Sequence, residues 1–285
     1  MRSMDDVEKV AIQGELGSNS HMAALAVMGD ERAFEIVPCA ISAEVFERLE
    51  DGSVSMAVLP IENSLHGSVF EHYDLLLEHG VAVVGETMLK IRHNVIAAPG
   101  VRLGEVRRVM SHPVALSQCR HWLRAHPSLE VMPGYDTAGS VKQLMDAGWR
   151  DVAGIAPALA AEQYGAEVLV AGIEDHPENY TRFYVLVKRD TVPWAPDADK
   201  LSVAFTLEHR PGTLLGALEE FRRAGLNLTK IESRPVPGRP WEYVFFVDVR
   251  FDSAAQVDGM LAELSASCER VEVLGRYRAA RLGAS

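Results

Sequence analysis

Short apolar runs alternate with helix-length amphipathic segments through the first 190 residues, and this alternation restricts the fold more than any other feature. The runs include KVAIQG, MAVLPI, VAGIAP and TRFYVLV, and segments such as NSHMAALAVMGD and VALSQCRHWLRAH lie between them. Strands that alternate with helices in this way build largely parallel sheets with helices on their faces. The sequence therefore predicts an α/β region over residues 1–188.

The pattern changes after RDTVPWAPDADK, residues 189–200, whose two prolines and several charges predict a linker. A strand-like run then precedes a helix-like segment with Pro211 near its first turn and Gly225 after its end. The remaining runs complete the order βαββαβ, which predicts a ferredoxin-like unit over residues 201–280. Such a unit has an extended surface free for pairing, so we expect a homodimer or homotetramer.

The charge of the chain excludes some classes of partner. It carries 40 Asp and Glu residues against 28 Lys and Arg, a formal net charge of −12, which argues against nucleic-acid or anionic-membrane binding. No apolar run approaches the ~18 residues of a membrane span and the start shows no signal region, so we expect a cytoplasmic protein. Three scattered cysteines predict reduced thiols, and ten histidines without a ligand-type pair predict no metal.

Polar residues concentrate where predicted strands lead into helices. Four such junctions are GELGSNSH, PIENSLHGS, SHPVALSQC and DTAGS. Ligands bind at these strand ends in open α/β sheets, and helix N-termini stabilise anions. One junction of this kind is usually only a helix cap. Four of them, followed by NYTRF on a further strand, predict a cleft between two lobes that binds a small anion.

The stretches LPIENSLHGSV, SHPVALSQCRHWL, DTAGSV and NYTRF resemble, in order and spacing, the motifs of prephenate dehydratases. The C-terminal unit resembles the ACT regulatory domain of that family, and the resemblance runs from about residue 9 to 278. It implies a two-lobed catalytic region like a periplasmic binding protein, with lobe one at about 9–90 and 175–188 and lobe two at about 91–174. The implied reaction converts prephenate to phenylpyruvate in L-phenylalanine biosynthesis, with loss of water and carbon dioxide and without a cofactor.

The family resemblance makes Thr181 the proton donor to the departing hydroxyl group. Alternation along a strand places Thr181 and Phe183 on one face and Arg182 on the other. We therefore expect Arg182 to anchor a carboxylate or the neighbouring lobe rather than to bind substrate, although substrate contact stays open. Glu62 would repel a dianion inside the cleft, so we expect a structural role for it.

The resemblance also implies which residues hold the substrate carboxylates and orient the ring: Asn63, Ser64, Ser111, Gln118, Thr137 and Ala138, together with Ser20. His112 is either a cation near substrate or a histidine satisfied at its junction, and Cys119 is expected in the core. The commoner family pattern has threonine where this chain has His72. This departure leaves open the choice between prephenate and arogenate, which has an amino group in place of the keto group.

RPGTLLGAL and IESRP resemble a phenylalanine site at an ACT dimer interface. The residues implied there are Gly212, Thr213, Leu214, Leu215, Asn227, Leu228, Glu232, Ser233, Arg234 and Pro235. Product binding away from the active site would act as a feedback switch through different affinities for two states. Two rival interpretations remain, an arogenate dehydratase and a non-catalytic two-lobed sensor of amino acids or anions.

Overall fold

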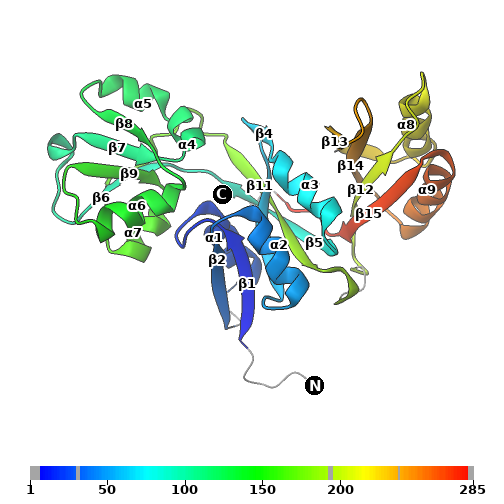
Figure 1. The fold of residues 1–285 in the computed structure, drawn as a ribbon, viewed down its shortest axis with the longest axis horizontal. Coiled ribbons are helices and arrows are strands. Elements are labelled where there is room, and N and C mark those ends of the chain that lie inside the picture. Colours follow the sequence, from blue (N-terminus) through cyan, green and yellow to red (C-terminus); the bar gives the residue numbers. More distant parts are fainter. Residues whose placement is uncertain (1–6, 30–32, 192–194, 237, 282–285) are drawn as a thin grey trace. The chain divides into compact units, whose positions relative to one another are not determined.

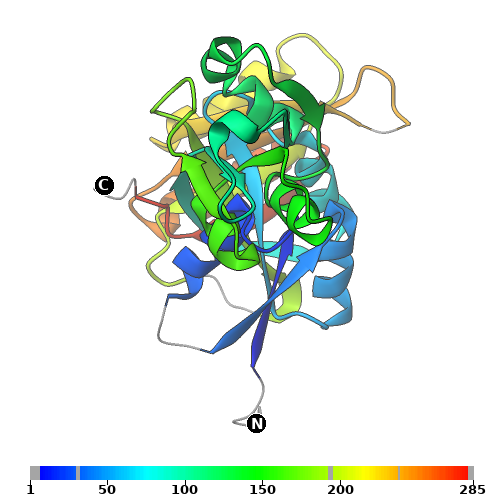
Figure 2. The same cartoon turned by 90° about the vertical axis from the view of Figure 1, so that its left-hand side faces the viewer.

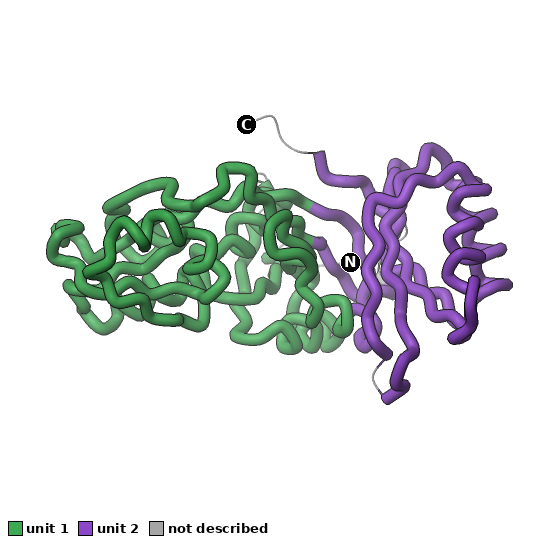
Figure 3. Tube along the Cα trace, turned by 90° about the horizontal axis from the view of Figure 1, so that it is seen from above, with its two compact units in different colours: residues 1–75, 87–183, 283–285 green, residues 76–86, 184–282 purple. Residues whose placement is uncertain are grey.

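The computed structural model describes residues 7–29, 33–191, 195–236 and 238–281 of the chain. They fall into two compact units, which comprise residues 1–75, 87–183 and 283–285, and residues 76–86 and 184–282 (Figure 3). The boundaries lie inside helix α3 (Phe70–Glu78) and strands β5 (Val81–Lys90) and β11 (Tyr180–Lys188), and the linker at residues 189–200 stays a prediction. Residues 192–194 of that linker lie outside the described residues, and Lys200 at its end already belongs to a strand.

The first sheet has the strand order β2-β1-β3-β11-β5, with β4 paired to β3 (Figure 1). Strand β1 is parallel to both of its neighbours, and its Val10, Ala11 and Ile12 are fully buried, as expected when helices cover both faces. Besides β5 and β11, the elements of this lobe are β1 (Glu8–Gln13), α1 (Asn19–Met28), β2 (Phe34–Cys39), α2 (Ser42–Asp51), β3 (Met56–Asn63), β4 (Gly67–Ser68) and α3 (Phe70–Glu78).

The second sheet has the order β10-β6-β9-β7-β8, and its elements run from cyan to green in Figures 1 and 2. Its central strand β9 is buried at every position, and β7 runs parallel to it. The elements are β6 (Asn94–Ala97), η1 (Leu103–Glu105), β7 (Arg108–Ser111), α4 (Pro113–Ser117), α5 (Arg120–Ala125), β8 (Glu130–Pro133), α6 (Thr137–Asp146), β9 (Val152–Ala156), α7 (Ala158–Tyr164) and β10 (Glu167–Val170). The predicted two-lobed α/β region is confirmed.

The C-terminal sheet is antiparallel, with the order β13-β14-β12-β15, and a core that includes Phe205 and Phe221 lies between it and two helices. This is the predicted ferredoxin-like order. Its elements follow a short 3-10 helix η2 (Arg189–Thr191) and are β12 (Lys200–Thr206), α8 (Thr213–Arg223), β13 (Asn227–Pro235), β14 (Tyr243–Arg250), α9 (Ala254–Ser267) and β15 (Arg270–Tyr277). Among the described helices, none is long and apolar enough to cross a membrane.

His72, the departure from the commoner family motif, is buried and fastens strand β3. Its Nδ1 donates to the carbonyl oxygen of Pro60 at 2.5 Å, because a carbonyl can only accept. Its Nε2 lies 2.9 Å from the hydroxyl oxygen of Ser42, which also donates to the Glu71 carboxylate at 3.1 Å. Burial lowers the pKa of His72, which keeps the ring neutral. The side chain therefore ties α2 and α3 to the strand that ends at Asn63.

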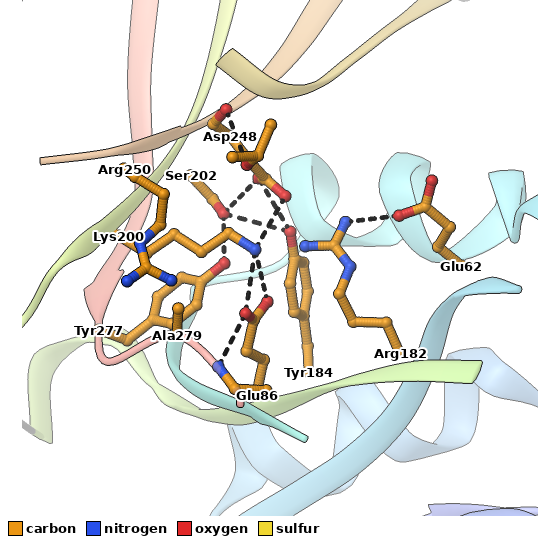
Figure 4. Close-up of polar contacts among 12 residues, drawn as sticks. Glu62, Glu86, Arg182, Tyr184, Lys200, Ser202, Asp248, Arg250, Tyr277 and Ala279 are labelled. Atoms are coloured by element: carbon orange, nitrogen blue, oxygen red, sulfur yellow. Dashed lines mark hydrogen bonds and ion pairs between the residues drawn. The ribbon is translucent and has the colours of Figure 1, made fainter. Parts of the chain in front are cut away.

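A cluster of buried charges lies within the second unit (Figure 4). The Lys200 ammonium donates to both carboxylate oxygens of Glu86, at 3.0 and 2.8 Å, and lies 3.6 Å from Asp248. Asp248 in turn accepts from Ser202 at 2.6 Å and from the hydroxyl of Tyr184 at 3.2 Å. The cluster thus joins strands β5 and β11 to strands β12 and β14 by charge-assisted hydrogen bonds, which are stronger than neutral ones.

Replacing Lys200 by methionine removes the cation that two buried carboxylates share. Deleting one partner of a buried ion pair typically costs about 3–5 kcal/mol, because the remaining charge stays in a poorly solvated position. We expect the Lys200→Met variant to lose about that much free energy of unfolding in a urea titration.

The matched control is the exposed pair between Arg250 and Asp199, 2.7 Å apart in the same unit. Exposed pairs contribute at most about 1 kcal/mol, so Arg250→Met should change the free energy of unfolding little. Equal losses in the two methionine variants would show that burial of the Lys200 cluster does not set its energy.

The buried histidines predict a pH dependence of stability. Burial lowers the pKa values of His21, His72 and His93 below their ordinary value. Between the folded and unfolded pKa values the unfolded chain binds more protons, so the free energy of unfolding falls as the pH drops below about 6.5. In the His72→Asn variant one of these groups is gone, so stability should fall less between pH 7 and pH 5. Urea titrations across that range measure both slopes, and identical slopes would remove His72 from this account.

Candidate active site

A cavity of about 570 Å³ lies within the first unit and is lined from both of its sheets. This is an ordinary size for a small-molecule site. All four polar junctions of the sequence reach it, and the lining includes Ser20, Asn63, His112 and Thr137. Thr181 and Phe183 of strand β11 complete that wall. The structure therefore brings together segments that are as far apart as residues 13 and 183.

Helices α1 and α6 begin at this cavity. Ser18 caps α1 by accepting from the backbone N–H of His21, and Asp136 caps α6 by accepting from Gly139. The first glycine-rich turn passes close to the α6 cap, since a Cβ on Gly14 would lie 2.6 Å from the Asp136 carboxylate. Gly14 also has a φ of 93°, which other residues rarely adopt. A side chain at position 14 would therefore be strained and would crowd the Asp136 cap.

Asn63 organises the hydroxyl group of Thr181. Its amide nitrogen donates to Thr181 Oγ1 at 2.9 Å and to the side-chain oxygen of Asn179 at 2.8 Å. The amide oxygen accepts from the backbone N–H groups of Leu65 and His66, both at 3.0 Å. The hydroxyl oxygen of Thr181 therefore acts as an acceptor toward Asn63, and its own proton remains to be donated elsewhere.

Arg182 and Glu62 form an ion pair that is absent from the cavity lining. The guanidinium Nη2 lies 2.9 Å from the Glu62 carboxylate, and the arginine side chain is only 7% exposed (Figure 4). Thr181 and Phe183 line the cavity on the other face of the strand. Arg182 thus neutralises Glu62 beside the site in this structure, and its contact with substrate remains a prediction.

The remaining expected residues divide by position. Gln118, Thr137 and Ser20 line the cavity with Asn63, whereas Ser64, Ser111 and Ala138 are absent from its lining. Ser111 is fully buried, and its hydroxyl donates to the carbonyl oxygen of Ile155 at 2.6 Å. His112 lines the cavity and also caps α4, where its Nδ1 accepts from the N–H of Val114. His112 is thus placed both to contact a substrate and to be satisfied at its junction, and the choice between these two roles stays open.

The cavity also includes charged and polar residues that the motif analysis does not single out. Lys142 lines it and donates to Glu15 at 2.9 Å, so its charge is already paired. Burial raises the pKa of Asp136, the cap of α6. His93 lines the cavity just beyond β5 and is only 2% exposed. A histidine at the end of an apolar strand run is the available sequence signal for His93, and it is a weak one.

Comparison with known proteins identifies the same region. The prephenate dehydratase family model matches residues 10–191, which contain all four junctions and NYTRF. An Arabidopsis thaliana chloroplastic protein named arogenate dehydratase/prephenate dehydratase 2 is 39% identical, covering 94% of this chain and 72% of its own.

Two solved structures are 32% identical in sequence and cover 95% of this chain. One, described as the quorum-quenching acylase GqqA, has a TM-score of 0.86 over 98% of its chain. The other is a prephenate dehydratase from Arthrobacter aurescens in complex with L-Phe, with a TM-score of 0.84 over 89% of its chain. The family match spans more than half of the sequence and the cavity lies within it, so the chain belongs to the prephenate dehydratase family.

Proposed function

We propose that this chain converts prephenate to phenylpyruvate in the cavity, with Thr181 as the proton donor to the leaving hydroxyl group. The observation that carries the assignment is the bond from Asn63 to Thr181 Oγ1, which leaves the threonine proton available. The hydroxyl lies in a largely enclosed position, since Thr181 is 8% exposed. A donor that is oriented before the reaction and shielded from water stabilises developing charge more effectively than a solvated one.

The reaction itself needs orientation more than chemical activation. As the ring carboxylate leaves as carbon dioxide, its bonding electrons enter the ring and expel the 4-hydroxyl group. Thr181 gives its proton to the departing oxygen, which leaves as water, and a solvent proton then restores the threonine. Aromatisation drives the reaction forward, so the cavity contributes mainly by positioning and proton donation.

The substrate is a dianion, and the support for its binding is backbone rather than basic side chains. Helices α1 and α6 begin at the border of the cavity, where Ser20 and Thr137 line it. Helix N-termini stabilise anions through these groups and the helix dipole. The lysine of the lining, Lys142, is paired with Glu15. We assign the two carboxylates to the helix termini and to the amide of Gln118.

A hydrolytic acylase is less consistent with this geometry. Nucleophilic catalysis by a threonine needs an adjacent base that accepts the hydroxyl proton. The partner of Thr181 Oγ1 in the structure is the amide nitrogen of Asn63, which donates and cannot take a proton. The hydroxyl is therefore arranged to give a proton away.

Thr181→Ala removes the donor and should lower kcat by at least ~10²-fold, the usual contribution of a general acid. Thr181→Ser keeps a hydroxyl and should retain much more activity. The rate is measured as absorbance of phenylpyruvate in alkali after incubation with prephenate. A kcat for Thr181→Ala above about a tenth of the wild-type rate would exclude Thr181 as the general acid.

The same assay distinguishes prephenate from arogenate. Arogenate carries an ammonium group, and the lining carboxylates Glu15 and Glu44 could favour it. Since Glu15 is already bonded to Lys142 and Tyr135, we expect prephenate to have the higher kcat/KM. Parallel assays with each substrate measure this ratio, and a higher kcat/KM for arogenate would assign the chain as an arogenate dehydratase.

We further propose that residues 201–280 form an ACT domain that binds phenylalanine and regulates the activity of the catalytic region, residues 1–188. A cavity of about 370 Å³ in this unit is lined by Thr213, Leu214, Trp241 and Tyr243. Gly212, between the lining residues Pro211 and Thr213, caps α8 with a φ of 89°. The L-Phe in the Arthrobacter aurescens structure supports an amino-acid effector.

Assembly through the edge strand β13 is part of this proposal. The strand is last in its sheet and carries the whole ESRP stretch, with Ile231 48% exposed. Leu215 on α8 is 73% exposed. An exposed edge strand with apolar side chains is suited to pairing with a second copy, which would bring ESRP of one protomer toward the glycine turn of the other.

Phenylalanine should bind at submillimolar to millimolar concentration and change the rate of phenylpyruvate formation. Leu214→Asp places a charge in the cavity and should weaken binding at least tenfold, whereas Arg223→Ala, outside the lining, should not. Equilibrium titration on the full chain gives both affinities. Absence of wild-type binding at millimolar phenylalanine would remove the effector claim.

A further inference from the structure

A chain of hydrogen bonds leads from the surface of the first unit to the cavity wall. His66 Nε2 lies 3.1 Å from Ser117 Oγ, and His66 Nδ1 lies 3.0 Å from the amide nitrogen of Gln118. The amide oxygen of Gln118 lies 2.7 Å from Nε2 of His93. Gln118 and His93 both line the cavity, whereas His66 and Ser117 are absent from its lining. His66 is exposed and His93 buried.

The position of each proton in this series of hydrogen bonds follows from the orientation of the Ser117 hydroxyl. The hydroxyl of Ser117 donates to the carbonyl oxygen of Val114 at 2.7 Å, so its oxygen accepts from His66 Nε2–H. In a neutral ring, Nδ1 of His66 is then bare and accepts from the Gln118 N–H. The Gln118 oxygen must consequently accept from His93 Nε2–H.

His93 fits this assignment. With its proton on Nε2, its Nδ1 is a bare lone pair, and that atom is buried with no hydrogen-bond partner among the described residues. A proton on Nδ1 would leave a buried donor unsatisfied, which costs more than an unsatisfied acceptor lone pair of this kind. Burial also lowers the pKa of His93, which favours the neutral ring.

The amide of Gln118 is thus held between an acceptor on one side and a donor on the other. Only one of its two orientations satisfies both neighbours. In that orientation one amide hydrogen bonds His66, and the second hydrogen is available to a ligand carboxylate. A flipped amide would present its oxygen in that place, and two oxygen acceptors repel one another.

We propose that His66 is a positioning residue that fixes the Gln118 amide, and through it the His93 tautomer, so that the cavity offers an N–H donor to an anionic substrate. The substrate part of this inference rests on the proposed function. His66 makes no contact with the cavity itself and acts only through Gln118. The backbone N–H of His66 is in turn held by Asn63, so replacing the imidazole leaves its loop anchored.

The test compares His66→Ala with His66→Asn. Alanine removes the acceptor, whereas the asparagine oxygen can occupy nearly the position of the imidazole Nδ1. We expect His66→Ala to raise the KM for prephenate about tenfold, the value of one hydrogen bond to a charged group, with kcat changed less than twofold. His66→Asn should restore the KM to within about twofold of wild type, because its oxygen accepts as Nδ1 does.

A spectroscopic measurement separates this inference from the identity of the substrate. Side-chain ¹⁵N correlation spectra of the full chain without ligand, at pH 8, report which nitrogen of His93 is protonated. We expect Nε2–H in the wild type and in His66→Asn, and a mixture of tautomers in His66→Ala. A wild-type His93 protonated on Nδ1, or an unchanged tautomer together with an unchanged KM in His66→Ala, would overturn the proposal. Failure of the proposed reaction would leave the spectra as expected but abolish turnover.

Discussion

The carboxamide of Asn63 is the interaction on which the candidate site depends. Its nitrogen orients the Thr181 hydroxyl and its oxygen holds the turn that carries His66. One planar group therefore fixes the proposed proton donor Thr181. Indirectly, it also fixes Gln118, the proposed N–H donor to a substrate carboxylate. A carboxylate could accept from the turn but could not donate to Thr181, and an aliphatic residue could do neither. Asparagine is required here because both ends of its amide are used.

Strand β11 extends this control beyond the cavity. Thr181 and Phe183 line the site, Arg182 pairs with Glu62 on the opposite face, and Tyr184 donates to Asp248 in the C-terminal unit. Alternation along one strand thus gives successive residues different tasks. Strand β11 contributes residues to both compact units.

Much of the fold was predictable because it depends on local patterns. Apolar runs of strand length, helix-length amphipathic segments and the order βαββαβ specify sheets and layers without knowledge of distant contacts. The polar junctions were predictable for the same reason, since strand ends in α/β sheets converge. The buried position of Lys200 at the start of a strand was not predictable in this way. Lys200 was predicted to end a linker, and lysine is seldom buried. It begins a buried strand because it pairs with Glu86 and Asp248, which are far away in sequence.

The individual site residues were harder to predict than the site. Ser111 and Gln118 belong to one motif, yet only Gln118 of the two lines the cavity. The hydroxyl of Ser111 donates to the carbonyl oxygen of Ile155. Which member of a motif faces the ligand depends on the rotation of a short helix, and no spacing specifies it. His66 and His93 have partners 52 and 25 residues away, so their roles become visible only when the lobes are folded.

The Lys200 cluster has a consequence for how such an enzyme can be divided. A chain cut after residue 188 would keep Glu86 and Tyr184 but lose Lys200, Asp248 and the backbone N–H of Ala280 that Glu86 accepts. It would also uncover Val83, against which Gly275 packs so closely that no side chain fits between them. Within the second unit, residues 184–282 therefore cover part of strand β5. A cut after residue 188 would therefore divide the second compact unit rather than separate two units.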